Sequence, residues 1–150
     1  MKSKIKDIMT SDVHVILPEC NIQEAAQKML NLDVGALPVC DGEKILGIVT
    51  DRDITLRAVA LGRDIQNAKA REIMSSPIVY CFENQDIEEV SRIMEVQQIR
   101  RLVVLSQEKK LVGIVSLGDV AVKTGRDDLA GEILEKVSMT STPETWPTGP

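Results

Sequence analysis

The chain of 150 residues contains an internal repeat, and this repeat limits the possible folds more than any other feature of the sequence. The matching segments are residues 8–10 with 73–75, residues 22–29 with 87–94, and residues 47–53 with 113–119. The first two pairs share an offset of 73 − 8 = 87 − 22 = 65, and the third has an offset of 113 − 47 = 66 because of a one-residue insertion. The correspondence spans most of residues 4–128, so we expect two copies of one structural unit.

Hydrophobic periodicity gives each unit the order strand, helix, strand, strand, helix. The elements expected in the first copy are strands at residues 13–17, 36–40 and 44–50, a helix that begins after Asn21, and a helix at residues 51–61. Asn21 and Glu24 have the spacing of a capping box, and Asp41-Gly42 between two apolar runs predicts a hairpin. We therefore predict an α/β (α+β-like) fold. Two β-α-β-β-α units, each with a small three-stranded sheet, would pack face to face as a pseudo-two-fold pair.

The second copy repeats these signals, with Asp86 as the helix cap and Glu89 three residues later. Its last helix is expected at residues 118–125. From Met139 onward the apolar period disappears, so we expect a disordered tail that holds the single tryptophan, Trp146. The predicted organisation is a first repeat with its N-terminal turn at residues 1–64, a second repeat at 65–128, a short C-terminal helix at 129–138 and the tail at 139–150.

Composition and charge argue against several classes of function. The apolar fraction is 43%, with one Phe, one Trp and one Tyr, so the core must be aliphatic. A net charge of −5 without a long basic run disfavours binding to nucleic acid or to an anionic membrane. No apolar run reaches the ~18 residues of a membrane span, and residues 1–6 are not followed by the apolar region of a signal peptide. The sequence predicts a cytoplasmic protein with reduced thiols at Cys20, Cys40 and Cys81.

Two motifs, Thr50-x-x-Asp53 and Ser116-x-x-Asp119, stand where a buried strand is expected to run into a helix. Free N–H groups and the positive end of the helix dipole meet there, which suits a phosphate or a sugar. The same spacing is also that of a capping box. Both roles remain open, and they are compatible because a helix N-terminus that binds a sugar still needs a cap.

With these motifs in place, the chain resembles a tandem pair of CBS domains, or Bateman module, and in particular the small stand-alone CBS-pair proteins of bacteria. The segments that carry the resemblance are residues 35–39 (GALPV), 47–53 (GIVTDRD), 99–104 (IRRLVV) and 113–119 (GIVSLGD). The resemblance covers nearly the whole chain and leaves only the tail outside.

The resemblance implies two crossed sites between the repeats for adenosine-containing ligands such as AMP, ADP, ATP or S-adenosylmethionine. In each site the adenine rests on one repeat and the ribose is held by the Thr/Ser-x-x-Asp motif of the other. The first expected site combines Thr10, Val13, Ala36, Leu37 and Pro38 with Ser116 and Asp119. The second combines Ser75, Ile78, Arg101 and Leu102 with Thr50, Arg52 and Asp53.

The two expected sites differ in charge. Arg100 and Arg101 stand where the first copy has Gly35 and Ala36, so the two adenine walls are not equivalent. Arg52 and Arg101 are both expected at the second site. Phosphate-rich nucleotides are therefore predicted to prefer that site, with a stronger dependence on salt.

The sequence contains no Ser-His-Asp set, paired-carboxylate cleft or P-loop, so we expect a regulatory nucleotide-binding module without catalysis. It would signal through its shape, its dimer state or an unknown protein partner. A homodimer is predicted because the helices at 51–61 and 118–125 carry apolar residues on more than one side. The alternatives are a ligand-free dimerisation scaffold and a thiol redox protein. His14 has no other metal ligand near it in the sequence, so we expect it to be structural and expect no metal site.

Overall fold

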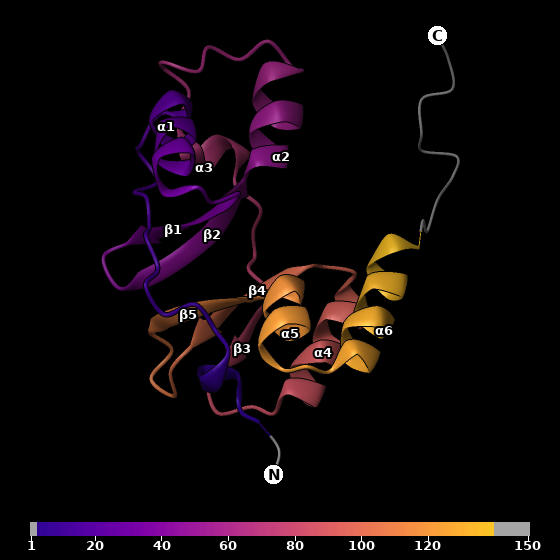
Figure 1. Cartoon of the computed structure of the whole chain (residues 1–150). Helices are drawn as coiled ribbons and strands as arrows, with labels where there is room; N and C mark the ends of the chain where they lie inside the picture. The colour runs from indigo at the N-terminus through magenta and orange to yellow at the C-terminus, as the bar shows by residue number, and fades with distance from the viewer. Residues whose placement is uncertain (1–2, 140–150) are drawn as a thin grey trace, which may run out of the picture.

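The computed structural model describes residues 3–139, so the tail beyond Met139, including Trp146, lies outside the described residues. The first repeat contains α1 (Ile22–Leu32), β1 (Ala36–Asp41), β2 (Lys44–Thr50), α2 (Asp51–Asp53) and η2 (Ile54–Val59). The second contains β3 (Tyr80–Phe82), α4 (Ile87–Gln97), β4 (Arg101–Leu105), β5 (Leu111–Ser116) and α5 (Leu117–Lys123). Short helical turns precede the repeats, η1 (Ile5–Asp7) and α3 (Ala70–Ile73), and α6 (Asp127–Ser138) follows the second repeat. The predicted fold of two α/β repeats is confirmed, and Figure 1 shows the repeats one above the other.

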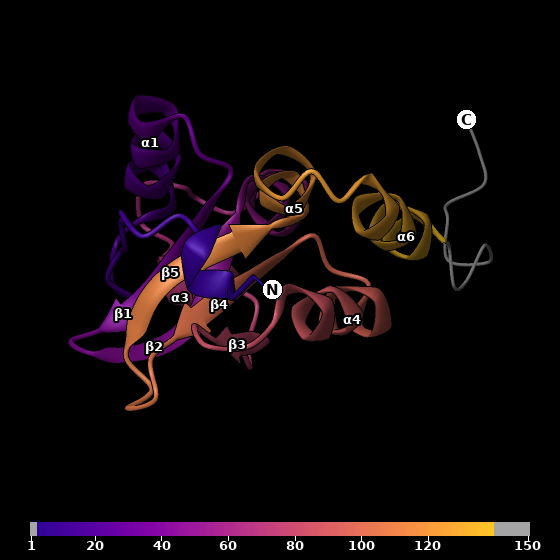
Figure 2. The same cartoon turned by 60° about the horizontal axis from the view of Figure 1, so that its bottom comes forward.

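Each repeat is built around an antiparallel hairpin. β1 pairs with β2, and Gly42 closes their turn with a φ of +64°, as Asp41-Gly42 predicted. In the second repeat β4 pairs in the same way with β5, and β3 adds a parallel strand beside β4. Figure 2 shows the two hairpins next to each other, with the helices toward the outside.

The helical turn that precedes each repeat packs into the other repeat. Ile5 of η1 is fully buried in the core of the second repeat, and its backbone N–H donates to Gln85 O at 2.9 Å. In the equivalent exchange, Ala70 and Ile73 of α3 are fully buried in the core of the first repeat, and Ala70 N donates to Cys20 O at 2.7 Å. In Figure 1 the indigo N-terminal turn accordingly lies with the lower half, whereas α3 lies with the upper half.

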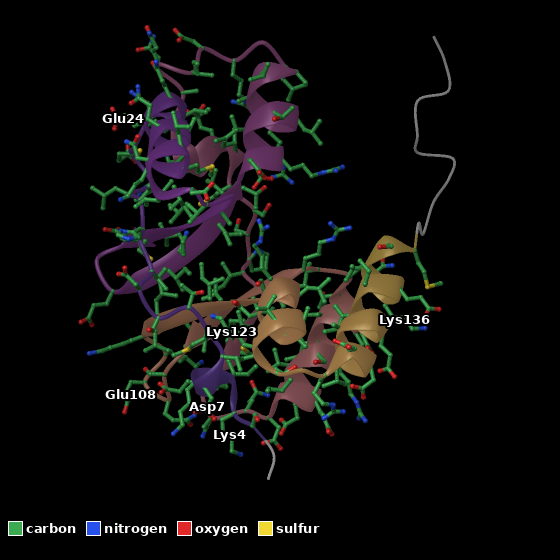
Figure 3. The ribbon with its side chains drawn as sticks, viewed as in Figure 1. Lys4, Asp7, Glu24, Glu108, Lys123 and Lys136 are labelled. Atoms are coloured by element: carbon green, nitrogen blue, oxygen red, sulfur yellow. The ribbon has the colours of Figure 1, made fainter. Side chains whose placement is uncertain are left out.

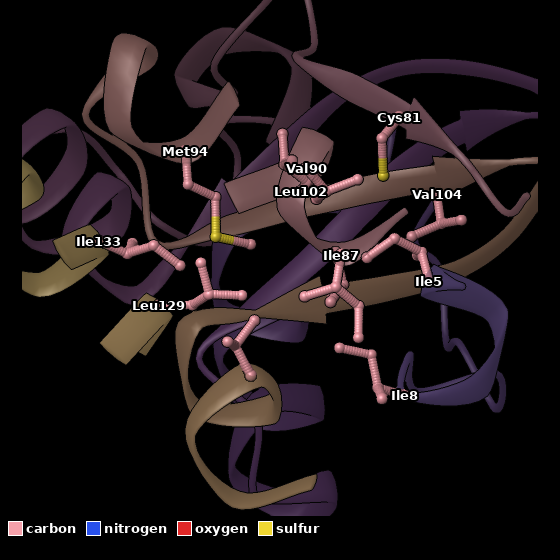
Figure 4. Packing of buried hydrophobic residues seen from close by; sticks show 12 residues of the cluster. Ile5, Ile8, Cys81, Ile87, Val90, Met94, Leu102, Val104, Leu129 and Ile133 are labelled. Carbon is pink, nitrogen blue, oxygen red and sulfur yellow. The ribbon is translucent and has the colours of Figure 1, made fainter. Parts of the chain in front are cut away.

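The exchange divides the apolar interior into two clusters of similar composition. The second-repeat cluster brings Ile5 and Ile8 against Ile87, Cys81 and Val104 (Figure 4), and α6 covers it with Leu129 and Ile133. The first-repeat cluster is Ile16, Ile22, Ala25, Met29, Leu37, Val39, Val49, Ala58, Ala70 and Ile73. Both clusters are aliphatic, as the shortage of aromatic residues predicted. Each is complete only when the turn contributed from the other half of the chain is in place.

After its turn, each connecting segment must cross the hairpin of the opposite repeat. Thr10 N donates to Ile114 O at 2.8 Å and Ile114 N donates to Thr10 O at 2.9 Å. Ser75 and Ile48 exchange the matching pair of bonds, at 2.8 and 3.1 Å. These contacts explain why glycine occurs at the equivalent positions Gly47 and Gly113. A Cβ atom on Gly113 would lie 2.9 Å from Thr10 O and 2.6 Å from the Met9 sulfur.

The strand expected at residues 13–17 is reduced to one isolated parallel bridge between Ile16 and Val39. Ile16 N donates to Pro38 O and Cys40 N donates to Ile16 O, each at 2.9 Å. The next bond of a parallel ladder would need an N–H from Pro38, which proline lacks. The described sheet of the first repeat therefore has two strands rather than the predicted three. The second repeat has Val103 at that position and forms its three-stranded sheet, with Val103 opposite Tyr80.

The helix expected at residues 51–61 begins as predicted at Asp51 but changes type after one turn. From Ile54 to Val59 it is a π-helix, in which Ala60 N donates to Thr55 O, five residues earlier. Gly62 then takes a φ of +70° and ends the helix. The corresponding α5 is a regular helix that ends at Lys123.

The cap at Asn21 is confirmed, because its side-chain oxygen accepts a hydrogen bond from Glu24 N at 2.8 Å. Asp86 is the N-cap residue of α4, as predicted, but its side chain makes no capping hydrogen bond. Its carboxylate instead accepts a bond from Lys4 Nζ at 2.9 Å, which fastens the N-terminal segment to the second repeat. Within residues 3–139, no helix is both long and apolar enough to cross a membrane.

We predict that Gly113→Ala destabilises the protein, because the added methyl group collides with the Thr10 carbonyl, which is held in place by its hydrogen bond from Ile114 N. Overpacking of this kind costs about 1–3 kcal/mol, or roughly 2–12 °C in Tm for a chain of this size. Gly131→Ala is the matched control, since nothing lies within 4 Å of its added Cβ in α6. It should stabilise the helix by about 0.5–1 kcal/mol. Equal melting temperatures for Gly113→Ala and the wild type would contradict the crossing contact.

Candidate functional site

A cavity of about 250 Å³ lies between the two repeats, beside the segment that crosses from the N-terminus. Its lining residues are Thr10, Asp12, Val13 and His14 from the crossing segment, Val34, Gly35, Ala36 and Leu37 from the first repeat, and Arg101, Ile114 and Ser116 from the second. Apolar side chains form much of this wall, and two hydroxyl groups, one carboxylate, one imidazole and one guanidinium are placed among them. Such a mixture of apolar and polar groups is typical of small-molecule sites.

The cavity is a consequence of the crossing. The bonds between Thr10 and Ile114 hold the N-terminal segment against β5, and Ser116 ends that strand. Ala36 begins β1, the first hairpin strand of the other repeat. Ser116 lies opposite Arg101 in the β4–β5 register, just as Thr50 lies opposite Ala36 in β1–β2. The two motif hydroxyls therefore occupy equivalent positions, one in each repeat.

The structure brings together most of the first expected set. Thr10, Val13, Ala36, Leu37 and Ser116 all line this cavity. The other two expected residues do not line it. Pro38 is buried in β1, and Asp119 lies one helical turn beyond Ser116 at the start of α5.

Both Thr/Ser-x-x-Asp motifs form capping boxes. Thr50 Oγ1 accepts a bond from Asp53 N at 3.1 Å, and Thr50 N donates to Asp53 Oδ2 at 2.9 Å. The equivalent distances between Ser116 and Asp119 are 3.0 and 2.9 Å. Each hydroxyl still carries a donor hydrogen that the box does not use. Ser116 can therefore cap α5 and also donate to a ligand.

The second carboxylate oxygen of each motif faces a basic side chain from the next turn. Asp53 Oδ1 lies 3.7 Å from Arg57 Nε, and Asp119 Oδ1 lies 3.1 Å from Lys123 Nζ. Lys123, labelled in Figure 3, also donates to Ile8 O at 3.1 Å. These bonds tie the start of each helix to the turn exchanged from the other half of the chain. A ligand near either motif would therefore lie close to the elements that join the repeats.

The second expected set is only partly assembled. Ser75 Oγ lies 3.4 Å from Asp53 Oδ1, next to the capping box of Thr50. Leu102 is 1% exposed within the core of the second repeat, and it does not line the cavity beside Ser116. Of the other members of this set, Ile78 is half-buried. Arg52 is exposed and forms no ion pair with any described residue.

The structure places Arg101 between the two expected sites. We expected it beside Thr50 and Asp53. It lines the Ser116 cavity, and the Gly35 carbonyl that it contacts also accepts a bond from Asp51 N, directly after Thr50. Its guanidinium reaches across to the first repeat, where Nη1 donates to Gly35 O at 3.4 Å. The direction of a long side chain between two pseudo-symmetric sites is not encoded by the repeat pattern.

Five lining residues were not singled out from the sequence as ligand contacts: Asp12, His14, Val34, Gly35 and Ile114. Gly35 directly precedes the expected wall residue Ala36, so its position in the sequence could have identified it as a lining residue. Ile114 could be found only from the crossing contact with Thr10. His14 was expected to be structural, but it borders the cavity with its Nε2 3.7 Å from Asp12 Oδ2.

A second cavity of about 320 Å³ lies between the tips of the two hairpins. Its walls include Cys40 and Gly42 from one hairpin and Lys110 and Val112 from the other. Val13 lines both cavities, so the crossing segment separates them. This second cavity contains none of the Thr/Ser-x-x-Asp residues.

The three cysteines are free thiols, and their surroundings disfavour the thiolate. Burial raises the pKa of Cys81 to about 12, and it also raises the pKa values of Cys40 and Cys20. A thiol with a raised pKa is a poor nucleophile at neutral pH. In the part of the chain that the structure describes, no three His, Cys, Asp or Glu side chains are grouped to hold a metal ion.

Comparison with known proteins identifies relatives along nearly the whole chain. A family model described as CBS domain matches it twice, over residues 5–59 and 70–123. The CBS domain-containing protein YhcV of Bacillus subtilis (strain 168) is 43% identical over 136 residues, which cover 91% of this chain and 96% of YhcV.

Many solved structures have similar folds, and two of them illustrate the match. Hypoxic Response Protein I, solved with two coordinated zinc ions, aligns with a TM-score of 0.72 at 38% identity and covers 79% of this chain and 97% of its own. The CBS domain pair of protein MJ0100 was solved in complex with 5′-methylthioadenosine and S-adenosyl-L-methionine. It aligns with a TM-score of 0.75 at 25% identity, over 85% of this chain and 99% of that chain.

Proposed function

Because the chain belongs to the CBS-domain family, we propose that it is a regulatory module that binds an adenosine-containing nucleotide between its two repeats, without catalysis. The observation that carries this proposal is the cavity in which Thr10, Val13, Ala36, Leu37 and Ser116 meet. The adenosine-type ligands bound by the related CBS pair of MJ0100 support the choice of ligand class. The candidates are AMP, ADP, ATP and S-adenosylmethionine.

The chemistry of the cavity suits a nucleoside. Val13, Ala36 and Leu37 offer an apolar wall for a purine ring. The hydroxyls of Thr10 and Ser116 can donate to ligand oxygens or accept from ligand hydroxyl groups. The wall residues come from both repeats, so a bound nucleotide would bridge two halves that otherwise meet through their own packing.

We also propose how binding is signalled. The ligand would tighten the contact between the crossing segment and both repeats, and this change would be detected by a protein partner in the cytoplasm or through the dimer state. The competing proposal is a ligand-free dimerisation scaffold. It is favoured by the observation that both motifs already have a purely structural use as capping boxes.

Nucleotide should raise the melting temperature of the wild-type protein. A ligand that binds only the folded state adds about 2.7 kcal/mol at ~100-fold excess over Kd, which corresponds to roughly 5–11 °C for a chain of this size. Asp119→Ala should reduce this shift, because it removes the carboxylate that accepts the bond from Ser116 N and helps to position Ser116 at the cavity. Thermal melting with and without each candidate nucleotide measures the effect.

Asp53→Ala is the matched control in this experiment, since it removes the equivalent carboxylate of the other capping box and should cost about the same 0.5–2 kcal/mol without ligand. The shift caused by nucleotide should survive in Asp53→Ala if the Ser116 cavity is the main site. A wild-type Tm that no adenosine compound moves would reject the sensing function and favour the scaffold. Loss of the shift in Asp53→Ala alone would move the site to the Thr50 motif.

The homodimer is a second part of this proposal. Large apolar side chains are exposed on the helices that follow the two motifs: Leu56 at 46%, Val59 at 63%, Leu61 at 68% and Val122 at 82%. Figure 1 shows α2 and α5 on the same side of the molecule, one from each repeat. Apolar groups gathered on one side are commonly covered by a partner, and a two-fold dimer would cover both helices at once.

Light scattering should therefore give a particle of twice the chain mass of 16.5 kDa. Val59→Glu combined with Val122→Glu should shift it toward the monomer, because two charges would be buried in the interface. Leu30→Glu is the control, since Leu30 is 79% exposed on α1 and belongs to neither of those helices. A wild-type monomer at high micromolar concentration would contradict the dimer, and a dimer unaffected by the paired substitution would place the interface elsewhere.

A further inference from the structure

The cavity between the tips of the two hairpins, of about 320 Å³, is not used by the proposed function. Its wall is largely aliphatic, with Val13 and Val15 from the crossing segment and Leu111 and Val112 from β5. Glu43 and Lys110, one from each hairpin, bring two opposite charges to the same cavity. Its size is near the lower end of the range for small-molecule pockets, which is roughly 300–1,000 Å³.

Irregularities in the two hairpins shape this cavity. In the β4–β5 register the pairing skips Val112, so this residue has no partner across the ladder. Such a β-bulge bends its strand and redirects a side chain. The first hairpin has the equivalent irregularity between Val39 and Cys40. Because Val112 and Cys40 both line the cavity, the two bulges contribute to its wall.

Smaller side chains line this cavity than stand at the equivalent positions of the second repeat. With the offset of 65 residues, Val13, Val15 and Cys40 correspond to Ile78, Tyr80 and Leu105. Each counterpart has the larger side chain. These differences between the repeats leave space on the side of the molecule where the N-terminal segment crosses.

The two charged groups are paired with each other, and the pair is weakly held. Glu43 Oε1 lies 3.5 Å from Lys110 Nζ, and the two side chains are 79% and 59% exposed. Within residues 3–139 neither charged group has another ion pair. Water screens both charges, so an exposed pair of this kind contributes little to stability. A ligand that offers one opposite charge to each group can therefore replace the pair at small cost.

The backbone that carries Lys110 is fixed. Ser106 N donates to Lys110 O at 2.8 Å, and Ser106 Oγ accepts a bond from Lys110 N at 3.2 Å. The flexible part is the side chain, whose ammonium group can turn from Glu43 to a ligand without a change in the hairpin.

We infer that this cavity binds a small zwitterionic amino acid with a branched aliphatic side chain, such as leucine. The ligand carboxylate pairs with Lys110, its ammonium group pairs with Glu43, and its side chain packs against the valines of the wall. Both charged groups of an amino acid are attached to one carbon, so they can reach two partners that lie 3.5 Å apart. The site is separate from the nucleotide cavity, and this inference does not depend on the proposed function.

Titration of the isotopically labelled protein with leucine, followed through its amide resonances, tests the inference. Leucine should shift the resonances of Val13, Cys40, Lys110 and Val112 until the site is saturated. The analogues 4-methylpentanoate and 3-methylbutylamine each lack one charged group and should bind about 3- to 10-fold more weakly. Glycine keeps both charges but lacks the side chain, so it should bind about 10-fold more weakly or worse.

Substitutions at the two tips separate the roles of the charges. Glu43→Gln should weaken leucine binding about 3- to 10-fold without weakening 4-methylpentanoate, which has no ammonium group. Lys110→Gln should weaken both compounds. The matched controls are Glu108→Gln and Lys109→Gln, since these residues belong to the same tip as Lys110 but do not line the cavity. Glu108 is labelled in Figure 3.

Three results would overturn this inference. They are a leucine titration that shifts no resonance at the hairpin tips, a leucine affinity that both Glu43→Gln and Lys110→Gln retain, and tighter binding of 4-methylpentanoate than of leucine. The last result would identify the ligand as a simple carboxylate. Each of them would leave the proposed function standing, because nucleotide binding is assigned to the other cavity.

Discussion

The exchange of two helical turns between the repeats is the constraint on which the rest of the structure depends. η1 completes the core of the second repeat with Ile5 and Ile8, and α3 completes the core of the first with Ala70 and Ile73. Because each turn is joined to its own repeat by a short segment, both segments must cross the opposite hairpin. The exchange thus links the two cores into one folding unit and fixes the path of the N-terminal segment.

The crossing also explains why the cavity has its present composition. The N-terminal segment is bonded to β5 through Ile114 and is bonded to β1 through its own residue Ile16. It therefore has to span the space between the repeats. Thr10 and Val13 border that space, while Ser116 and Ala36 stand at the ends of the strands on either side. The capping boxes add the second requirement, since Thr50 and Ser116 each end a hairpin strand and cap the helix that follows it. Packing, capping and ligand binding therefore use overlapping sets of residues.

Much of the fold could be predicted because the same pattern of residues occurs twice in the sequence. The offset of 65 residues identified both repeats, and the signals at Asn21 and Gly42 gave a cap and a turn that the structure contains. The exchange of η1 and α3 could not be predicted, because the repeat pattern does not distinguish a turn that packs against its own repeat from one that packs against the other repeat. The loss of the strand expected near Ile16 depends on a single missing N–H at Pro38, and the path of Arg101 depends on space that only tertiary packing creates.

The central claim is that an adenosine nucleotide binds between the crossing segment and the two repeats. Amide resonances of the isotopically labelled protein, followed during a titration with AMP, test it most directly because they report location as well as binding. The account predicts that the largest shift changes occur at Thr10, Ala36 and Ser116. Changes confined to Cys40, Lys110 and Val112 would place the ligand in the cavity between the hairpin tips and contradict the account, as would a spectrum that millimolar AMP leaves unchanged.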